Sequence, residues 1–283
     1  MDQAHSLKKL AQSRREQKSA VYPCEVLAVT SGKGGVGKTQ ISLNLALALS
    51  VHSRVLLLDA DMGTANVDVL LGIDPRKNLS HVLNQETNIS DILVPINDKL
   101  DLLPGTSGLA VQTPANFGWN PVIEEAEQLS QRYDFILVDT AAGITETIIE
   151  LLSTADRVLL VCTSEPTAIV DAYALCKTLF QRNPHRQIEL IANSVQNSEE
   201  AVEIYTKIQG AIRHFLKRDI SFLAEVPFDQ HIVRSIHQQQ PVFQSNPSLP
   251  ISKTFASLAH QLKHSKKWTG TYGLSQIIKT LKI

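Results

Sequence analysis

The sequence predicts an α/β protein, with a mainly parallel β-sheet that is covered by helices on both faces. Short apolar runs alternate with segments of helical periodicity, an order typical of parallel strands joined by right-handed crossovers. A glycine-rich segment, residues 32–37, separates the first apolar run from the first helical segment, at the kind of strand end where such folds bind ligands. With 283 residues and 43% hydrophobic content, the chain can form one large core.

Six apolar runs mark the expected strands: Val26–Val29, Val55–Leu58, Phe135–Val138, Val158–Val161, Ile188–Ala192 and the stretch Ile220–Val226. Helical periodicity lies between most of them, at Ile41–Ser50, Thr145–Ser153, Ala168–Phe180 and Glu199–Leu216. Several runs are apolar at consecutive positions, which indicates strands buried on both faces of a sheet. We therefore expect one domain at residues 21–264, with a leader at residues 1–20 and a tail at residues 265–283.

The composition argues against several classes of protein. A net charge of −1 gives no general attraction to nucleic acid, so we expect no specific nucleic-acid partner. The three cysteines form no C-x-x-C pair, which argues against a disulfide framework, an Fe–S cluster or a structural zinc. No apolar stretch is long enough to span a bilayer and no signal peptide is visible, so a cytoplasmic protein is expected.

The first motif is Gly-Lys-Gly-Gly-Val-Gly-Lys-Thr at residues 32–39. Its spacing matches the phosphate-binding loop, or P-loop, in which backbone N–H groups hold the phosphates of a nucleoside triphosphate. In this pattern Lys38 reaches the β and γ phosphates and Thr39 coordinates Mg²⁺. The expected nucleotide contacts are Gly32, Gly34, Gly35, Val36, Gly37, Lys38, Thr39 and Gln40. A glycine turn without a ligand is the alternative, and the strand, loop and helix order disfavours it.

A second lysine, Lys33, follows the first glycine of this loop. Because Lys38 already fills the usual role of the P-loop lysine, Lys33 is expected to serve a different phosphate, across a dimer interface.

Aspartates follow two of the apolar runs. Asp59 and Asp61 come at the end of the Val55–Leu58 run, and Asp139 closes the Phe135–Val138 run. Carboxyl ends of parallel strands meet at one edge of a sheet, so these carboxylates should face the phosphate loop. P-loop enzymes use such an aspartate to hold the water shell of Mg²⁺. The alternatives are a surface turn at Asp59 and Asp61, and a purely structural Asp139, although a lone buried carboxylate is costly.

These motifs carry a family resemblance. The two-lysine loop, Asp59-Ala60-Asp61-x-Gly63 and Asp139-x-x-x-Gly143 together resemble the deviant Walker A ATPases related to MinD and ParA. Within that group, residues 61–72, residues 165–175 and the N-terminal residues 2–8 are similar to the FlhG/FleN family of flagellar number regulators. The resemblance covers nearly the whole chain.

The resemblance implies a P-loop NTPase fold of MinD/ParA type and a slow, switch-like ATPase with ATP and Mg²⁺ as cofactors. ATP would be sandwiched in a homodimer, with Lys33 of one subunit touching the phosphates held by the other. Asp61 would orient the attacking water, Asp59 and Asp139 would support Mg²⁺ and its waters, and Thr39 would coordinate the ion.

Less specific positions are implied for adenine recognition, namely Asn193 and the segment Pro227-Phe228-Asp229. Asn193 has an alternative role, since asparagine also caps turns through local backbone bonds. Gln40 departs from the family pattern, where a small hydroxyl residue is common.

The tail contains an apolar stripe at helical spacing, formed by Leu274, Ile277, Ile278 and Leu281. Such a stripe with lysines beside it is typical of a helix lying on an anionic membrane surface. Two copies in an ATP dimer would bind with added avidity, so the protein should be peripheral at the inner face of the cell membrane when ATP is bound. The alternative is a helix packed on its own domain. Membrane binding and packing on the domain are both possible if the helix is docked without ATP and released with it.

The leader has a partner-binding pattern at Asp2, Gln3, Ala4, Leu7 and Lys8. The resemblance implies that this partner is FlhF, a GTPase whose hydrolysis the leader stimulates. Relatives usually carry arginine where Lys8 stands, and lysine lacks the planar fork. A disordered basic leader without a partner is the alternative.

The function expected from the resemblance is ATP-dependent control of the number and placement of flagella, through stimulation of FlhF. Flagellar switch proteins and a flagellar transcriptional regulator are further candidate partners. Alternatives with the same fold are a MinD-like division-site ATPase and a ParA-like partition ATPase. Other classes are an amide-forming ligase, an Fe–S carrier and an adaptor that hardly hydrolyses ATP.

Overall fold

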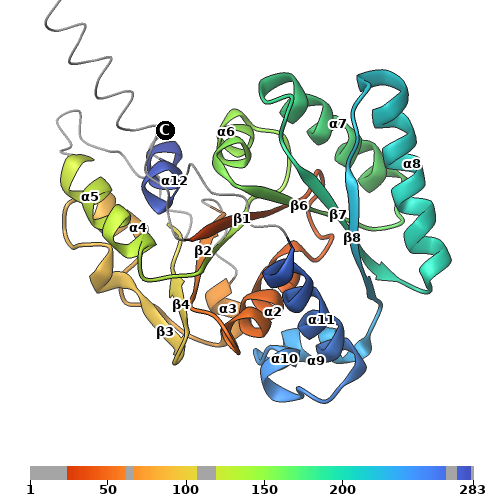
Figure 1. The fold of residues 1–283 in the computed structure, drawn as a ribbon. Coiled ribbons are helices and arrows are strands. Elements are labelled where there is room, and N and C mark those ends of the chain that lie inside the picture. Colours follow the sequence, from red (N-terminus) through yellow and green to blue (C-terminus); the bar gives the residue numbers. More distant parts are fainter. Residues whose placement is uncertain (1–23, 62–66, 107–118, 266–272, 282–283) are drawn as a thin grey trace, which may run out of the picture.

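The computed structural model describes residues 24–61, 67–106, 119–265 and 273–281, which form a single sheet with helices on both faces (Figure 1). The strand order is β3-β4-β2-β5-β1-β6-β7-β8, and every neighbouring pair is parallel except β3 and β4. The strands are β1 (Glu25–Thr30), β2 (Val55–Ala60), β3 (Val94–Asn97), β4 (Leu100–Leu103), β5 (Phe135–Thr140), β6 (Arg157–Cys162), β7 (Ile188–Val195) and β8 (Ser221–Pro227). The predicted fold class is confirmed.

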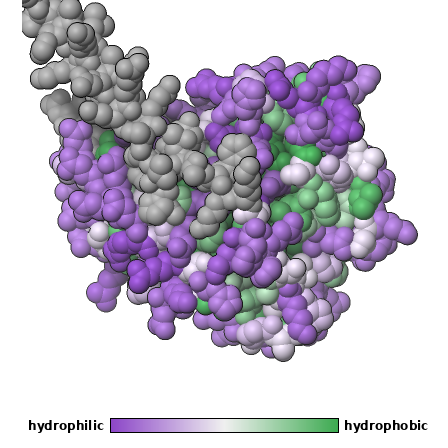
Figure 2. Space-filling model, viewed as in Figure 1, coloured by the Kyte–Doolittle hydropathy of each residue, from purple (hydrophilic) through white to green (hydrophobic). Residues whose placement is uncertain are grey.

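Two layers of helices cover the sheet (Figure 1). One layer is a series of neighbours, α5 (Trp119–Ser130), α12 (Leu274–Thr280), α6 (Glu146–Thr154), α7 (Pro166–Arg182) and α8 (Ser198–Leu216). The other contains α2 (Lys38–Ser50), α9 (Gln230–Gln238), α10 (Val242–Ser245) and α11 (Pro250–His264). The short helices α3 (Val67–Leu71), α4 (Leu79–Leu83) and η1 (Ser90–Ile92) connect β2 to β3. Most of the surface visible in Figure 2 is hydrophilic, with apolar residues in small patches.

The central strands are the ones that the apolar runs predicted. Every residue of β1, β2, β5 and β6 is buried, as expected for strands with helices on both sides. Fully burying a leucine or phenylalanine contributes about 1.5–3 kcal/mol, so side chains such as Leu27, Leu57 and Phe135 account for much of the core stability.

The hairpin of β3 and β4 was not predicted. Each of these strands has four residues, too few for a clear alternation of apolar and polar side chains. Pro95 lies in β3, which is the edge strand, where a missing N–H group is tolerated. The hairpin extends the sheet beyond β2.

The tail helix α12 is packed on the domain. Leu274 and Ile277 are 0% exposed, Ile278 is 2% and Leu281 is 5% exposed, because α5 and α6 enclose this face. The backbone N–H of Leu274 donates to Oγ of Ser130 at 2.9 Å. The expectation that these four side chains are available to a membrane is therefore not met in this conformation, which shows the packed alternative. The domain thus includes part of the tail assigned to residues 265–283.

The predicted leader, residues 1–20, lies outside the described residues. Within the described ranges, no helix is both long and apolar enough to cross a membrane.

Candidate active site

The phosphate loop connects β1 to α2 at the carboxyl edge of the sheet. Gly35 and Gly37 have φ values of 80° and 88°, a left-handed conformation that glycine adopts without strain. Gly37 caps α2 without a side-chain hydrogen bond, and the first turn of α2 contains no acidic residue. The N–H groups at this helix start therefore suit an anion such as a nucleotide phosphate.

Close packing fixes the shape of the loop. A Cβ atom at Gly32 would lie 2.3 Å from the backbone of Asp171 in α7, and one at Gly37 would lie 2.4 Å from Nδ2 of Asn193. That Nδ2 atom donates to the carbonyl of Val36 at 2.7 Å. Asn193 thus supports the phosphate loop, a role that the sequence did not suggest. The turn that follows β7 is capped instead by Asn197, whose Oδ1 accepts from the backbone at the start of α8.

Lys38 and Asp139 face each other inside the site. Nζ of Lys38 lies 3.4 Å from Oδ1 of Asp139, and the hydroxyl of Ser42 donates to the same oxygen at 2.7 Å. Burial raises the pKa of Asp139, while Lys38 and the hydroxyls of Ser42 and Thr39 act in the opposite direction. Lys38 is close enough to stabilise the ionised carboxylate.

The other oxygen of Asp139, Oδ2, is buried and has no hydrogen-bond partner among the described residues. An orphaned carboxylate oxygen beside a P-loop threonine fits the water shell of Mg²⁺, which favours carboxylate and water ligands. Thr39 and Asp139 are therefore the residues that would hold the ion. When bound, Mg²⁺ would neutralise charge on the phosphates.

Asp59 accepts hydrogen bonds from the backbone at Asp61 and at Val67. Its Oδ1 accepts the N–H of Asp61 at 3.1 Å, and its Oδ2 accepts the N–H of Val67 at 3.2 Å. Asp59 is paired in register with Asp139 across β2 and β5, so both predicted carboxylates are at one edge of the sheet. Asp59 is 1% exposed and belongs to β2, so it is not part of a surface turn. Residues 62–66, which follow Asp61, lie outside the described residues.

Lys33 is held by its own chain. Its Nζ pairs with Oε2 of Glu165 and donates to Oγ1 of Thr167 at 2.9 Å. Both partners are at the start of α7, more than 130 positions away in the sequence. These two residues were not predicted as lysine partners, although they belong to the segment that carried the resemblance.

A cavity of about 390 Å³ adjoins the phosphate loop and has room for the base and sugar of a nucleotide. Its lining includes, from the predicted set, Gly35, Val36, Gly37, Gln40, Asn193, Pro227, Phe228 and Asp229. Ile232, Val233 and Ile236 of α9 also line the cavity and were not predicted, although their helical spacing after the Pro227–Asp229 segment was an available signal.

Two of the predicted contacts also have structural roles. Oδ1 of Asp229 accepts the N–H of His231 at 2.7 Å and so caps α9. Oε1 of Gln40 accepts from Nδ2 of Asn44 at 3.2 Å, which connects the departure from the family pattern to a hydrogen bond within α2. Pro227 and Phe228 remain the positions that can contact a base through apolar surface.

The comparisons with known proteins agree with this geometry. Residues 24–263 match the protein family described as ParA: NUBPL iron-transfer P-loop NTPase. The antiactivator FleN of Pseudomonas aeruginosa is 34% identical over 253 residues, which cover 87% of this chain and 89% of FleN. The flagellum site-determining protein YlxH of Helicobacter pylori is 33% identical over 264 residues, covering 90% and 88% of the two chains. A chain of the MinC:MinD cell division protein complex of Aquifex aeolicus superposes with a TM-score of 0.69 at 27% identity, over 87% of this chain and 98% of that chain.

The iron transfer in the family description is not supported by the cysteines of this chain. Cys24, Cys162 and Cys176 are buried and unpaired. Burial raises the pKa of Cys24 and of Cys162 to about 12, so both thiols are protonated at neutral pH. Among the described residues no three His, Cys, Asp or Glu side chains form a group that could hold a metal.

This chain has a phosphate loop with two lysines, Lys33 and Lys38, and carboxylates at the ends of β2 and β5. The chain belongs to the MinD/ParA family of P-loop ATPases, in its FlhG/FleN branch.

Proposed function

We propose that the chain is an ATP-operated dimerisation switch that controls the number and placement of flagella at the cell membrane. The position of Lys33 carries the proposal, since this loop lysine contacts α7 of its own chain rather than the phosphate cradle. The names of two relatives, antiactivator FleN and flagellum site-determining protein YlxH, supply the cellular process.

The hold on Lys33 is weak enough to be reversible. The Lys33 and Glu165 side chains are 37% and 62% exposed, and exposed ion pairs contribute about 0–1 kcal/mol. A partner subunit with ATP offers Lys33 the phosphate oxygens, which carry more negative charge than one carboxylate. Binding of the second subunit can therefore draw Lys33 away from Glu165.

Within such a dimer the residues divide the work of hydrolysis. The N–H groups of the loop and Lys38 hold the phosphates, and Asp61 orients a water molecule for attack on the γ-phosphorus. The bond to the β-phosphate breaks, and ADP and phosphate leave. Lys33 from the partner stabilises the charge that develops, as an arginine finger does in other phosphoryl-transfer enzymes.

Lys33 is connected to the tail helix through neighbouring helices. Glu165 and Thr167 are at the start of α7, α7 packs on α6, and α6 packs on α12. Arg182 of α7 also pairs with Glu146 of α6 at 3.2 Å. We propose that dimerisation shifts this series and releases α12, whose apolar face then lies on the anionic membrane. Undocking exposes Leu274, Ile277, Ile278 and Leu281 to water. Insertion into the membrane interface buries these four side chains again.

The leader completes the proposal. Asp2, Gln3, Ala4, Leu7 and Lys8 would stimulate the GTPase FlhF, and the switch proteins and a transcriptional regulator would bind the domain in one nucleotide state. A division-site or partition role is the alternative within the family. Recovery of division proteins or DNA, without flagellar components, in an ATP pull-down from the native cell would favour that alternative.

The test measures molar mass by light scattering during size exclusion. An Asp61→Ala variant with ATP should elute as a dimer, because bound ATP is retained, and with ADP it should be a monomer. Adding Lys33→Ala should return the protein to the monomer while ATP binding persists. A monomer at every concentration of the Asp61→Ala protein with ATP would rule out the switch.

A further inference from the structure

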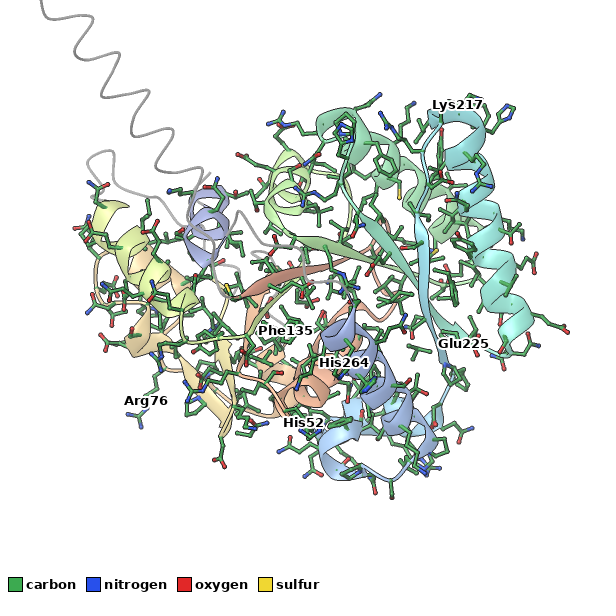
Figure 3. All side chains as sticks on the ribbon, in the orientation of Figure 1. His52, Arg76, Phe135, Lys217, Glu225 and His264 are labelled. Atoms are coloured by element: carbon green, nitrogen blue, oxygen red, sulfur yellow. The ribbon has the colours of Figure 1, made fainter. Side chains whose placement is uncertain are left out.

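A basic cavity lies at the edge of the sheet opposite the phosphate loop. It has a volume of about 430 Å³ and is formed by the loops that precede β2, β4 and β5. Its cationic side chains are Arg54, Lys99 and Arg132. His52, which follows α2 and is labelled in Figure 3, also lines the cavity. The cavity is separate from the nucleotide site, which is at the carboxyl ends of the strands.

The order of the sheet brings these residues together. Strands β4, β2 and β5 are adjacent and parallel, so their amino ends share one edge. The N–H of Val55 donates to the carbonyl of Lys99 at 2.8 Å, and the N–H of Asp134 donates to the carbonyl of Arg54 at 2.8 Å. Regular backbone pairing therefore fixes the positions of the three loops relative to one another. Two of these loops carry the arginines Arg54 and Arg132.

The basic side chains of this cavity are not neutralised by acidic residues in the part of the chain that the structure describes. Within the described ranges, no carboxylate forms an ion pair with Arg54, Lys99 or Arg132. Among the described residues that line the cavity, the acidic one is Asp134, whose Oδ2 accepts the backbone N–H of Arg54 at 2.8 Å. The guanidinium of Arg132 is 6.0 Å from the ring centre of Tyr133. Three positive side chains with one carboxylate in the same lining favour a bound anion.

The position of the cavity indicates the source of that anion. Oγ of Ser130 accepts the N–H of Leu274, the first residue of α12, at 2.9 Å. Arg132 follows Ser130 by two residues, so their Cα atoms are at most about 8 Å apart. A membrane surface that receives α12 as it leaves this position would therefore come within reach of the cavity. A nucleic acid or a soluble metabolite has no comparable reason to arrive at this edge.

We infer that Arg54, Lys99 and Arg132 bind the headgroup phosphate of an anionic lipid when α12 engages the membrane. This inference rests on the proposed membrane association and adds a second, polar contact to it. Arginine forks match phosphate oxygens, with two N–H groups to one phosphate. One basic side chain near an anionic surface contributes about 1 kcal/mol, equivalent to roughly a 5-fold change in binding.

The experiment measures partition of the full chain, loaded with a non-hydrolysable ATP analogue, onto vesicles. One set contains phosphatidylethanolamine and phosphatidylglycerol, and the other contains only phosphatidylcholine. The test variant is Arg54→Gln with Arg132→Gln. The control, Lys217→Gln with Arg218→Gln, removes the same charge from exposed positions after α8, away from the cavity (Figure 3). A chain without residues 274–283 reports on α12 itself.

The expected result is a loss of about 25-fold in partition onto the phosphatidylglycerol vesicles for the double arginine variant, and less than about 3-fold for the control. Partition onto phosphatidylcholine should be equally weak for both. Equal loss in the two variants, with binding that still depends on residues 274–283, would overturn the headgroup site and leave membrane association standing. Absence of vesicle binding by the unaltered chain would overturn both.

Two further measurements separate the other sources of phosphate. Soluble glycerol phosphate at millimolar concentration should not displace the protein from vesicles, because one free headgroup lacks the contribution of α12. Displacement of the protein by glycerol phosphate would assign the cavity to a free phosphate compound.

A short DNA duplex should bind the double arginine variant and the control equally. Selective loss of duplex binding in the arginine variant, with unchanged vesicle binding, would assign the cavity to nucleic acid.

Discussion

At the scale of single residues, the site divides into groups that a motif can reveal and groups that only the fold can reveal. Lys38, Thr39 and Asp139 were predictable because their spacing and strand position follow from phosphate chemistry. Glu165 and Thr167 were not predictable as partners of Lys33, because they are more than 130 positions away in the sequence. Contacts of that range depend on the order of strands in the sheet, which no local pattern contains.

A titratable residue outside the site illustrates the same dependence on the fold. Asp156 immediately precedes β6, is 8% exposed, and accepts the N–H of Val26 at 2.8 Å through Oδ2. Burial raises the pKa of Asp156 from 3.8 to about 7, and Glu25 adds to the shift, while the Val26 hydrogen bond and Arg186 oppose it. The folded state thus keeps a proton that the unfolded chain has lost, so the free energy of unfolding falls as pH rises from about 4 to 7.

Replacing this carboxylate should therefore stabilise the protein only at higher pH. At pH 8 Asp156→Asn removes a penalty of at most about 4 kcal/mol, because about 1.4 kcal/mol corresponds to one unit of pKa. The amide oxygen can still accept the N–H of Val26. We expect the Tm of Asp156→Asn to exceed that of the unaltered chain by several degrees at pH 8 and to match it at pH 4, by calorimetry. A rise in Tm of the same size at pH 4 and at pH 8 would contradict the raised pKa of Asp156.

At the scale of elements, the apolar runs predicted the strands that are buried on both faces, and failed for the short hairpin of β3 and β4. Helix α12 shows a different limit. Its stripe of four apolar residues requires an apolar cover, but a protein surface and a membrane interface satisfy that requirement with similar burial. The apolar stripe alone therefore could not predict whether a protein surface or a membrane covers it. The cover depends on the surface that α5 and α6 form together.

The docking of α12 can be tested at one hydrogen bond. Ser130→Ala removes the acceptor of the Leu274 N–H, a net loss of about 1 kcal/mol, which should raise the undocked population roughly 5-fold. We expect vesicle binding with ADP to increase for this variant, as measured by co-sedimentation. The matched control is Ser153→Ala, because Ser153 of α6 and Ser130 of α5 both donate to the carbonyl four residues earlier. If both variants bind vesicles equally, docking does not limit membrane association.

At the scale of the whole molecule, the central claim is that Lys33 and Asp61 act from different subunits on the same ATP. In one chain Lys33 is bound to Glu165, so a monomer leaves its phosphate loop without the second lysine. Hydrolysis should then depend on assembly, and ATPase activity per chain should rise with protein concentration. Concentration dependence alone does not show which subunit supplies Lys33, because a dimer could also reorganise each site internally.

Mixing two inactive variants separates these cases. Lys33→Ala has an intact Asp61, and Asp61→Ala has an intact Lys33. A dimer of one copy of each therefore contains one complete site if Lys33 acts on the partner's ATP, and none if it acts on its own. Each mixed dimer has one working site of two, so activity should recover above that of either variant alone, to at most about half of the unaltered level. The measurement is phosphate release against the ratio of the two variants, which should peak at equal amounts. Activity that stays at the level of the separate variants would place Lys33 in its own site, and the coupling of hydrolysis to dimerisation would then require another cause.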